Sequence, residues 1–461
     1  MIRVFNMFVP TSFLFLALAD AGVLASAMIL CLSLSYATLD IVLTNQEGHL
    51  HQTIVFTAMT IPCLFMMGLY ERKYLLTIKV LYLRILIGLG LSFLCLMTIF
   101  YVVPGSRIWM SALFPALALA SVGLLGNRAV VTRIASIQSL KNRVLVLGTG
   151  PQAQRIERAE RELRPANFIV LGFAPVEPCA TCVTESRVVR ANDLLSLCET
   201  LNADEVVVAL EHPEQSVPRE TLLQFRLRGI RILDTATFFE REFGQLEIDR
   251  PYPNWLLFSN GSTMGRFETA VKRTFDITVS LGFLLFALPL LCFTALAVKL
   301  EDGGPIFYRQ ERVGLNGRKF SVIKFRSMRV DAEKDGVARW ASVDDPRVTF
   351  IGGIIRKIRI DEIPQIFNVL SGEMSFVGPR PERPSIVNDL IKDMSCYPYR
   401  HIVKPGITGW AQVNYPYGAS IADAREKLKF DLYYVKNCSL MLDLIILLQT
   451  VRVVIWPQGV R

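Results

Sequence analysis

The segment KRTFDITVSLGFLLFALPLLCFTALAVKL, residues 272–300, decides how the C-terminal part of this protein meets a membrane. It contains an apolar run at 275–298, and a helix needs about 20 apolar residues to cross a bilayer. Three features argue against a crossing. Pro289 falls in mid-run and kinks a helix, cations lie at both ends as is typical of cytoplasmic flanks, and a crossing would export everything that follows. We therefore predict a re-entrant helix at 275–298, which enters one leaflet, bends near Pro289 and returns.

Four further apolar runs precede this segment, at about 11–37, 52–70, 85–103 and 108–126, each near the length that crosses a bilayer. The loop between the first two runs has no Lys or Arg. Cations gather between the second and third runs and after the fourth: Arg72, Lys73, Lys79, Arg84, Arg128, Arg133, Lys141 and Arg143. The positive-inside rule then places the N-terminus and residue 127 onward in the cytoplasm, so we predict a four-helix transmembrane bundle within residues 1–135. Asp20 lies inside the first run, either as a functional intramembrane charge or facing the neighbouring helices.

Composition agrees with membrane attachment. The chain has 461 residues, room for two or three domains, and its mean hydropathy of +0.37 is too apolar for a purely soluble protein. A net charge of +9 and a pI of about 9.1 suit an anionic partner such as a membrane surface, a nucleotide or a phospholipid. The apolar N-terminal third argues against nucleic acid as that partner. Nine scattered cysteines indicate a reducing compartment, and Cys179 with Cys182 is expected to form an ordinary loop rather than a zinc or redox site.

Residues 141–250 have the pattern of an α/β domain. RVLVLGTG reads as a buried strand entering a glycine turn, PQAQRIERAERELR as a helix, and FIVLGF, DEVVVAL and GIRIL as further strands. The spacing in GTGPQA, residues 148–153, matches the GxGxxA dinucleotide fingerprint. The acid expected about 20 residues later is at best Glu177. We predict a Rossmann-like domain without bound NAD, followed by a linker at 251–270.

A basic hairpin opens the C-terminal part of the chain, residues 271–461. RVGLNGRKFSVIKFRSM shows two short strands around Asn316–Gly317, the usual signal of a tight hairpin. Strand alternation puts Lys324 and Arg326 on one face, as a phosphate pocket requires. A solvated or lipid-facing surface is the other explanation for so many cations.

The stretch RIDEIPQIFNVLSGEMSFVGPRP, residues 359–381, carries two adjacent acids, Asp361 and Glu362. Acids and a proline favour the first turn of a helix, so a plain helix start is one explanation. A phosphoryl-transfer site is the other and needs cations, because the transferring group, leaving group and acceptor are all anionic. Arg380 stands between two prolines with little backbone freedom. Further charged residues lie nearby: Asp344, Asp345, Arg347, Arg356, Lys357 and Arg359. The cations favour the second explanation, in which one acid is the nucleophile and the other holds a hard divalent cation.

From Lys272 to the C-terminus the chain resembles the bacterial sugar transferase family, the monotopic polyprenyl-phosphate hexose-1-phosphate transferases. The matching motifs are KRTFDI, GPIFYRQERVGLNGRKFSVIKFRSM, DDPRVTFIGGIIRKIRIDEIPQIFNVLSGEMSFVGPRP, KPGITGWAQVNY and SLMLDLIILLQTV, in the expected order over about 190 residues. With the preceding helices and Rossmann-like domain, the chain looks like the long form of the family, which initiates exopolysaccharide or O-antigen assembly. The expected fold is therefore a mixed membrane protein: a transmembrane bundle, a Rossmann-like α/β domain, and an α/β catalytic domain with a re-entrant helix.

The resemblance implies a reaction and its site. Asp361 would attack the β-phosphorus of a UDP-sugar and expel UMP, and undecaprenyl phosphate would attack the aspartyl intermediate to give undecaprenyl-diphosphate-sugar. Glu362 would position Mg²⁺. The nucleotide and phosphates would be bound by GPRP and nearby cations: Lys324, Arg326, Arg347, Arg359, Arg380 and Pro381. The resemblance further implies a homodimer in the bacterial cytoplasmic (inner) membrane, with its catalytic domain on the cytoplasmic face and downstream polysaccharide glycosyltransferases as partners.

Other functions stay open at this stage. An enzyme that transfers only the sugar to a lipid carrier would release UDP and need no aspartyl intermediate. A membrane-anchored scaffold or sensor would use the basic tail merely to hold lipid. The identity of the sugar cannot be read from these motifs. Near the C-terminus, SLMLDLIILLQTVRVVIW is expected to be an interfacial helix, with burial inside the catalytic domain as the alternative.

Overall fold

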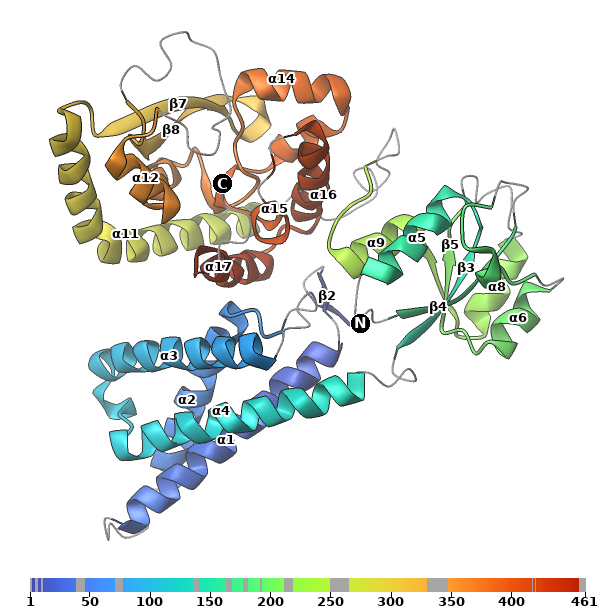
Figure 1. Ribbon diagram of the computed structural model, residues 1–461, viewed down its shortest axis with the longest axis horizontal. Helices are drawn as coiled ribbons and strands as arrows, with labels where there is room; N and C mark the ends of the chain where they lie inside the picture. Colours follow the sequence, from blue (N-terminus) through green and yellow to red (C-terminus); the bar gives the residue numbers. More distant parts are fainter. Residues whose placement is uncertain are drawn as a thin grey trace. The chain divides into compact units, whose positions relative to one another are not determined.

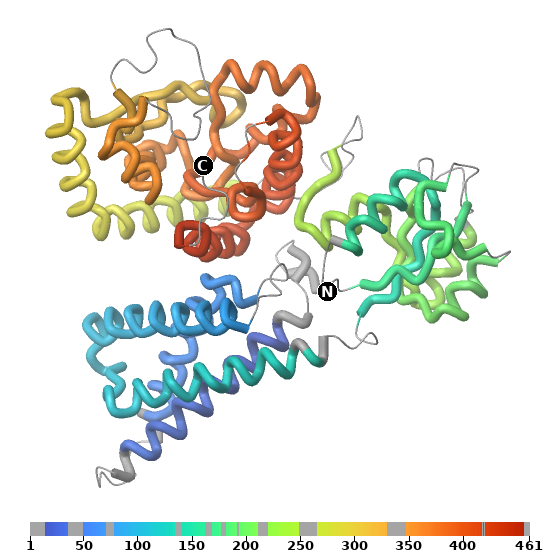
Figure 2. The backbone as a smooth tube through the Cα atoms, viewed as in Figure 1, coloured from blue at the N-terminus to red at the C-terminus, as the bar shows by residue number. Residues whose placement is uncertain are grey.

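A computed structural model of the chain describes residues 2–4, 7–9, 11–38, 46–70, 78–135, 141–162, 168–176, 181–190, 193–210, 219–248, 265–329, 347–416, 418 and 420–455. The chain divides into two compact units (Figures 1 and 2). One comprises Pro10–Glu242, and the other comprises Phe243–Arg461 together with Met1–Val9. The first nine residues contain a short antiparallel pair, β1 (Ile2–Val4) and β2 (Met7–Val9).

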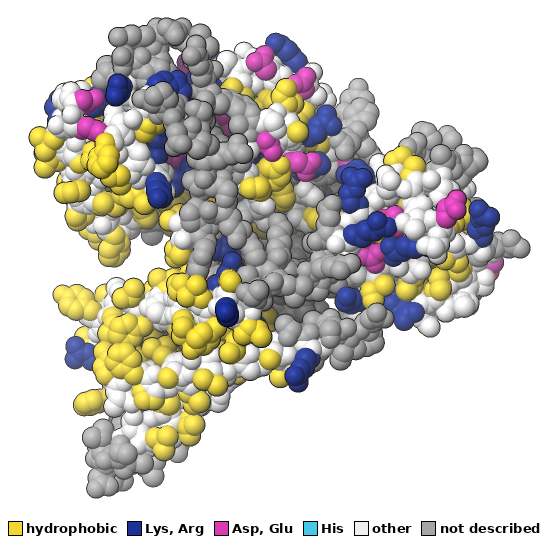
Figure 3. All heavy atoms as spheres, in the orientation of Figure 1, with side chains coloured by type: hydrophobic (Ala, Val, Ile, Leu, Met, Phe, Trp, Pro, Cys, Tyr) yellow, Lys and Arg dark blue, Asp and Glu magenta, His cyan; other side chains and the backbone are white. Residues whose placement is uncertain are grey.

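The N-terminal bundle consists of four helices: α1 (Thr11–Thr38), α2 (Gln46–Met66), α3 (Ile78–Val102) and α4 (Met110–Ala135), with η1 (Pro104–Ser106) between the last two. Figure 3 shows hydrophobic side chains over the visible face of this bundle, as expected where lipid replaces water. Among the described helices, α1, α3 and α4 are long and apolar enough to cross a membrane. The segment of α2 begins QEGHLHQT and holds Pro62, which makes it more polar than the other three.

A buried polar cluster joins α1 to α4 inside the bundle. Asp20 is fully buried and its Oδ2 accepts hydrogen bonds of 2.7 Å from both the Tyr70 hydroxyl and the Arg128 guanidinium. Its Oδ1 accepts from Asn127 Nδ2 at 2.6 Å, and Arg128 lies over the Tyr70 ring. Asp20 therefore faces its neighbouring helices, the second of the two positions considered for it.

We expect the change Asp20→Leu to destabilise the bundle by about 3–5 kcal/mol, because removing one partner leaves the buried Arg128 charge uncompensated. Thermal unfolding of the detergent-solubilised protein measures the loss. The double change Asp20→Leu/Arg128→Leu is the control, and it should recover much of the stability because both charges are gone. A single variant as stable as the wild type would contradict the prediction.

The central α/β domain contains a four-stranded parallel sheet in the order β4-β3-β5-β6. The strands are β3 (Asn142–Leu147), β4 (Phe168–Ala174), β5 (Glu205–Val208) and β6 (Arg231–Asp234). The helices are α5 (Pro151–Glu162), η3 (Glu185–Arg187), α6 (Leu194–Thr200), α8 (Arg219–Leu227) and α9 (Thr235–Phe243). Helices α6 and α8 pack on the face that presents Leu145 and Leu147, and α5 and α9 lie on the other side (Figure 1). The predicted parallel sheet is confirmed.

The glycine turn after β3 has a structural explanation. Gly148 adopts a φ of 121°, and a Cβ placed on it would lie 2.4 Å from the carbonyl oxygen of Ala209. Close approach of the segment after β5 therefore requires glycine here, whether or not a dinucleotide binds. Glu177 and Cys179 lie outside the described residues, as does most of the predicted linker.

The catalytic domain predicted at 271–461 is mixed. Its hairpin pairs β7 (Phe307–Val313) with β8 (Lys319–Phe325) antiparallel around η4 (Leu315–Gly317), and β9 (Ser375–Val377) pairs with β10 (Gly406–Thr408) in parallel. The remaining elements are α11 (Arg266–Asp302), α12 (Phe350–Lys357), η5 (Ile360–Gln365), α13 (Ile366–Ser371), α14 (Pro384–Asp393), η6 (Tyr397–Ile402), α15 (Trp410–Asn414), α16 (Ile421–Asn437) and α17 (Leu440–Ile455). The tight hairpin is confirmed: Asn316 and Gly317 have φ values of 53° and 75°.

Helix α11 carries the long apolar run and changes direction sharply part-way along its length (Figures 1 and 2). Pro289 is its internal proline, a residue that commonly kinks helices. Much of its apolar surface is exposed, including Phe286 at 79% and Phe293 at 71%. By length and composition α11 is also a candidate membrane span, which makes four candidate membrane helices with α1, α3 and α4.

The polar N-terminal part of α11 is fastened to the catalytic domain. Lys272 Nζ lies 2.5 Å from Asp443 Oδ2 on α17, and Asp276 accepts a hydrogen bond from the Ser375 hydroxyl on β9. Helix α17 itself buries Leu442 and Ile446 in the core of this domain while its Met441 side is exposed. The buried face of α17 therefore agrees with the alternative to an interfacial helix, which was burial inside the catalytic domain.

Candidate active site

The acid pair lies in the 3₁₀ helix η5, at its first turn. Arg359 just before it has a left-handed φ of 62°, which turns the chain between α12 and η5. Because a 3₁₀ helix has 3.0 residues per turn, neighbouring side chains diverge by roughly 120°. Asp361 and Glu362 are consequently directed into different environments, as separate roles require.

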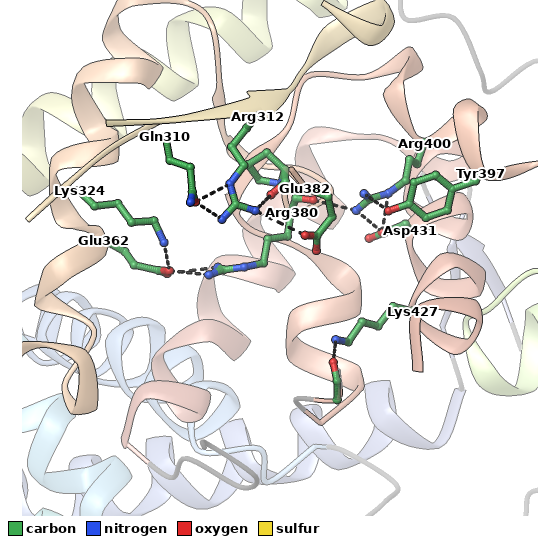
Figure 4. A network of polar contacts seen from close by, with 12 residues as sticks. Gln310, Arg312, Lys324, Glu362, Arg380, Glu382, Tyr397, Arg400, Lys427 and Asp431 are labelled. Carbon is green, nitrogen blue, oxygen red and sulfur yellow. Dashed lines mark hydrogen bonds and ion pairs between the residues drawn. The ribbon is translucent and has the colours of Figure 1, made fainter. Parts of the chain in front are cut away.

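Glu362 is held by two cations from different elements (Figure 4). Lys324 Nζ from β8 lies 2.8 Å from its Oε1. Arg380, which follows β9, reaches Oε1 at 2.5 Å and Oε2 at 3.2 Å. Burial alone would raise the pKa of Glu362, but Arg380 and Lys324 outweigh it and hold this pKa well below its usual value. Glu362 is thus kept ionised by two residues that lie 38 and 18 positions away from it in the sequence.

Asp361 has a different environment. It is 9% exposed, and its Oδ1 is buried without a hydrogen-bond partner among the described residues. Burial, followed by the charge of Glu362, raises the pKa of Asp361, although Lys324, Arg359 and Arg380 oppose the rise. One oxygen of Asp361 is thus desolvated and has no hydrogen-bond partner among the described residues, whereas both oxygens of Glu362 accept hydrogen bonds.

The other predicted site residues differ in the partners that they contact. Arg326 follows the end of β8 and pairs with Asp302 at the end of α11. Lys324, which strand alternation placed on the same face, contacts Glu362 instead. The Arg347 backbone carbonyl accepts from Arg329 N at 2.9 Å. Pro381 is buried and its carbonyl accepts from the Arg312 guanidinium at 3.0 Å. Asp344 and Asp345 lie outside the described residues.

The structure also brings residues to this region that the sequence did not single out. Arg312 from β7 contacts Gln310 and Glu382 beside Arg380. Arg400 and Asp431 form a second buried pair in the same network (Figure 4). The dense cations of the hairpin were a signal for Arg312. No sequence signal connected Arg400 with Asp431.

The described residues contain no group of three or more His, Cys, Asp or Glu side chains that could hold a metal ion by themselves. Glu362 nevertheless has the chemistry of a magnesium ligand, because Mg²⁺ in proteins is commonly held by one or two carboxylates together with substrate phosphates and water. Glu362 Oε2 accepts one hydrogen bond, from Arg380 at 3.2 Å, and so has a lone pair available.

The pH dependence of the reaction should respond to Arg359. Its charge lowers the pKa of Asp361, so Arg359→Gln should raise that pKa. A nucleophilic Asp361 must be ionised, and the acid limb of kcat/KM should therefore move to higher pH. Pre-steady-state kinetics across pH measures this shift. Arg356→Gln, a neighbouring cation on α12, is the control, and an acid limb that moves equally in both variants would contradict the assignment.

Residues 267–457 match the family model described as bacterial sugar transferase. A relative from Aeromonas hydrophila, UDP-N-acetylgalactosamine-undecaprenyl-phosphate N-acetylgalactosaminephosphotransferase, is 38% identical over 304 residues, which are 65% of this chain and 70% of the relative. The chain belongs to the bacterial sugar transferase family. The predicted family is confirmed, and with it the enzyme class of polyprenyl-phosphate sugar phosphotransferases.

Two further relatives of this sugar transferase match it over smaller shares of their own length. The undecaprenyl-phosphate glucose phosphotransferase of Komagataeibacter xylinus is 34% identical over 321 residues, 68% of this chain and 59% of the relative. The UDP-glucose:undecaprenyl-phosphate glucose-1-phosphate transferase of Escherichia coli (strain K12) is 43% identical over 183 residues, 39% of each chain. The names of these relatives differ in the sugar, so they do not identify the sugar used here.

Proposed function

We propose that this sugar transferase moves a hexose-1-phosphate from a UDP-sugar to undecaprenyl phosphate, releasing UMP and forming undecaprenyl-diphosphate-sugar. The reaction would be the initiating step of exopolysaccharide or O-antigen synthesis. The observation that carries the proposal is the contrast within the acid pair: Asp361 has a buried, unpaired oxygen, and Glu362 is ionised between Lys324 and Arg380.

In the first half-reaction, Asp361 Oδ1 attacks the β-phosphorus of the UDP-sugar. A bond forms between this oxygen and phosphorus, the bond from phosphorus to the bridging oxygen breaks, and UMP departs with the electron pair. A carboxylate nucleophile is suited to this step, because it divides one difficult transfer into two easier ones. In the second half-reaction an oxygen of undecaprenyl phosphate attacks the same phosphorus and releases the Asp361 carboxylate.

The cations around the acids have distinct tasks. Arg380 is one-third exposed at its side chain, so its planar fork can bind phosphate oxygens while it contacts Glu362. Lys324 and Arg359 add positive charge where the anionic substrates meet. Glu362 would hold Mg²⁺ together with substrate phosphates, and the metal when bound neutralises part of the diphosphate charge.

The membrane geometry follows from the acceptor, whose tail stays in the bilayer and whose phosphate stays at the interface. We assign α11 as a re-entrant helix on the cytoplasmic leaflet of the inner membrane. Its change of direction, Pro289 and its exposed phenylalanines support this assignment, as do the cations at both ends. Homodimer formation and hand-over to downstream glycosyltransferases remain proposals from the family resemblance.

Product analysis tests the function. Purified protein in lipid is supplied with undecaprenyl phosphate, Mg²⁺ and a panel of UDP-sugars, and released nucleotides are separated. We expect UMP with one sugar and no UMP when Mg²⁺ is chelated. Release of UDP would instead support a simple glycosyltransferase. Folded protein that releases neither nucleotide with any sugar would support a scaffold.

A further inference from the structure

The GPRP loop, residues 378–381, is fixed by its carbonyl groups. Pro379 O accepts from Gly406 N at 3.0 Å, and Gly378 N donates to Thr408 O at 2.9 Å. These two bonds tie the start of the loop to the segment around β10. Since the two prolines of the loop have no N–H group, carbonyl acceptors are its main means of attachment.

Two arginine side chains, the half-buried Arg312 and the buried Arg400, hold the rest of the loop. Arg312 donates to Pro381 O at 3.0 Å. Arg400 donates to the main-chain carbonyl of Arg380 at 2.8 Å. Directly after the loop, Val313 N donates to Glu382 O at 2.9 Å.

The Arg400 guanidinium has several partners besides the carbonyl of Arg380. Its Nε and one terminal nitrogen donate to Asp431 Oδ2 on α16 at 3.1 and 2.7 Å. Its other terminal nitrogen donates to the Tyr397 hydroxyl at 2.9 Å, and the guanidinium lies over the Tyr397 ring. Arg400 and Asp431 are 5% and 4% exposed. This places a fully partnered guanidinium directly behind the residue that contacts Glu362 (Figure 4).

A buried ion pair contributes little to stability by itself, since desolvation offsets much of the attraction. Such a pair is better explained by a need for one fixed geometry. Here the geometry is that of the Arg380 backbone, from which the phosphate-binding fork projects. Lysine could not replace Arg400, because one ammonium cannot make two contacts to Asp431 and reach the carbonyl in the same plane.

We infer that Arg400 and Asp431 are positioning residues that aim the Arg380 fork at the UDP-sugar diphosphate. The inference rests on the proposed function, because it gives Arg380 a substrate to bind. It assigns a role in the reaction to two residues that do not contact the acid pair themselves.

The test is a double-mutant cycle on UMP release in lipid, using the full-length protein. Arg400→Lys should lower kcat/KM by roughly 10²-fold, since a misplacement of about 1 Å costs that much. In the Arg380→Lys background, which already lacks the fork, Arg400→Lys should lower kcat/KM by less than about twofold. Asp431→Asn, which keeps the side-chain volume, should show the same dependence on Arg380 and serves if Arg400→Lys does not fold.

Arg241→Lys is the matched control. Arg241 makes an equally buried two-bond pair with Glu205 in the α/β domain, at 2.8 Å for both contacts. Its change should leave kcat/KM unaltered in folded protein. If Arg400→Lys lowers kcat/KM equally in both Arg380 backgrounds, its role is only structural and the inference is overturned. A wild type that releases no UMP would overturn the proposed function instead.

Discussion

Replacing the proposed nucleophile, Asp361→Asn, is expected to lower UMP release by on the order of 10⁴-fold or more. The amide has nearly the volume of the carboxylate, so the domain should remain folded, but it cannot attack phosphorus. The buried, unpaired Oδ1 is the atom that would be lost as a nucleophile. Initial rates of UMP release in lipid measure the effect, with thermal unfolding as a check on folding.

The same variant separates covalent from direct transfer. UDP-sugar labelled at the β-phosphate and incubated without undecaprenyl phosphate should leave label on the wild-type protein. The label should be absent from Asp361→Asn and should leave the wild type when undecaprenyl phosphate is added. Label on the folded Asp361→Asn protein would show that another residue carries the phosphosugar, and absence of label from both proteins would show direct transfer.

The second large effect is expected for Glu362→Gln, which should lower kcat/KM by roughly 10³-fold. The change removes the negative charge that pairs with Lys324 and Arg380. It also removes a carboxylate oxygen that we propose as a ligand of Mg²⁺. Two buried or half-buried cations would then lack their partner, so Arg380 would lose its orientation toward the diphosphate. Steady-state kinetics at several Mg²⁺ concentrations measures both effects.

Glu426→Gln is the matched control for this change. Glu426 makes a 2.6 Å contact with Lys429 one turn away on α16, and 39% of its side chain is exposed. Exposed pairs of this kind contribute little, so its kcat/KM should stay close to that of the wild type. If Glu362→Gln kept wild-type kinetics and the same Mg²⁺ dependence, Glu362 could not be the metal ligand.

Local sequence was sufficient to propose the acid pair as the reacting groups. Asp361, Glu362, Lys324 and Arg380 were all predicted, and the structure brings Glu362 into contact with both cations. Motif order predicted the family because each motif is continuous in the chain. The length of the apolar runs likewise predicted membrane helices, and shorter apolar runs predicted the strands of the α/β domain, since both signals are continuous in the chain.

Arg326 has a partner that its local sequence did not predict. Alternation placed it beside Lys324, but β8 ends at Phe325, and the next side chain turns to Asp302 at the end of α11. Alternation predicts direction only while the strand continues. A carboxylate 24 residues earlier was the better partner for a buried arginine, and nothing in the hairpin sequence revealed it.

The sequence by itself determined the family. It also supplied the acids and cations that we propose for the reaction, and the apolar segments that indicate membrane attachment. Only the tertiary structure decided which cations reach which acid. It also decided that one oxygen of Asp361 is buried without a hydrogen-bond partner among the described residues. It likewise decided that Arg400 and Asp431, 31 residues apart, lie behind Arg380. The physical reason is that a residue's type and near neighbours set its chemistry, whereas desolvation and ion pairing depend on segments that fold together from distant parts of the chain.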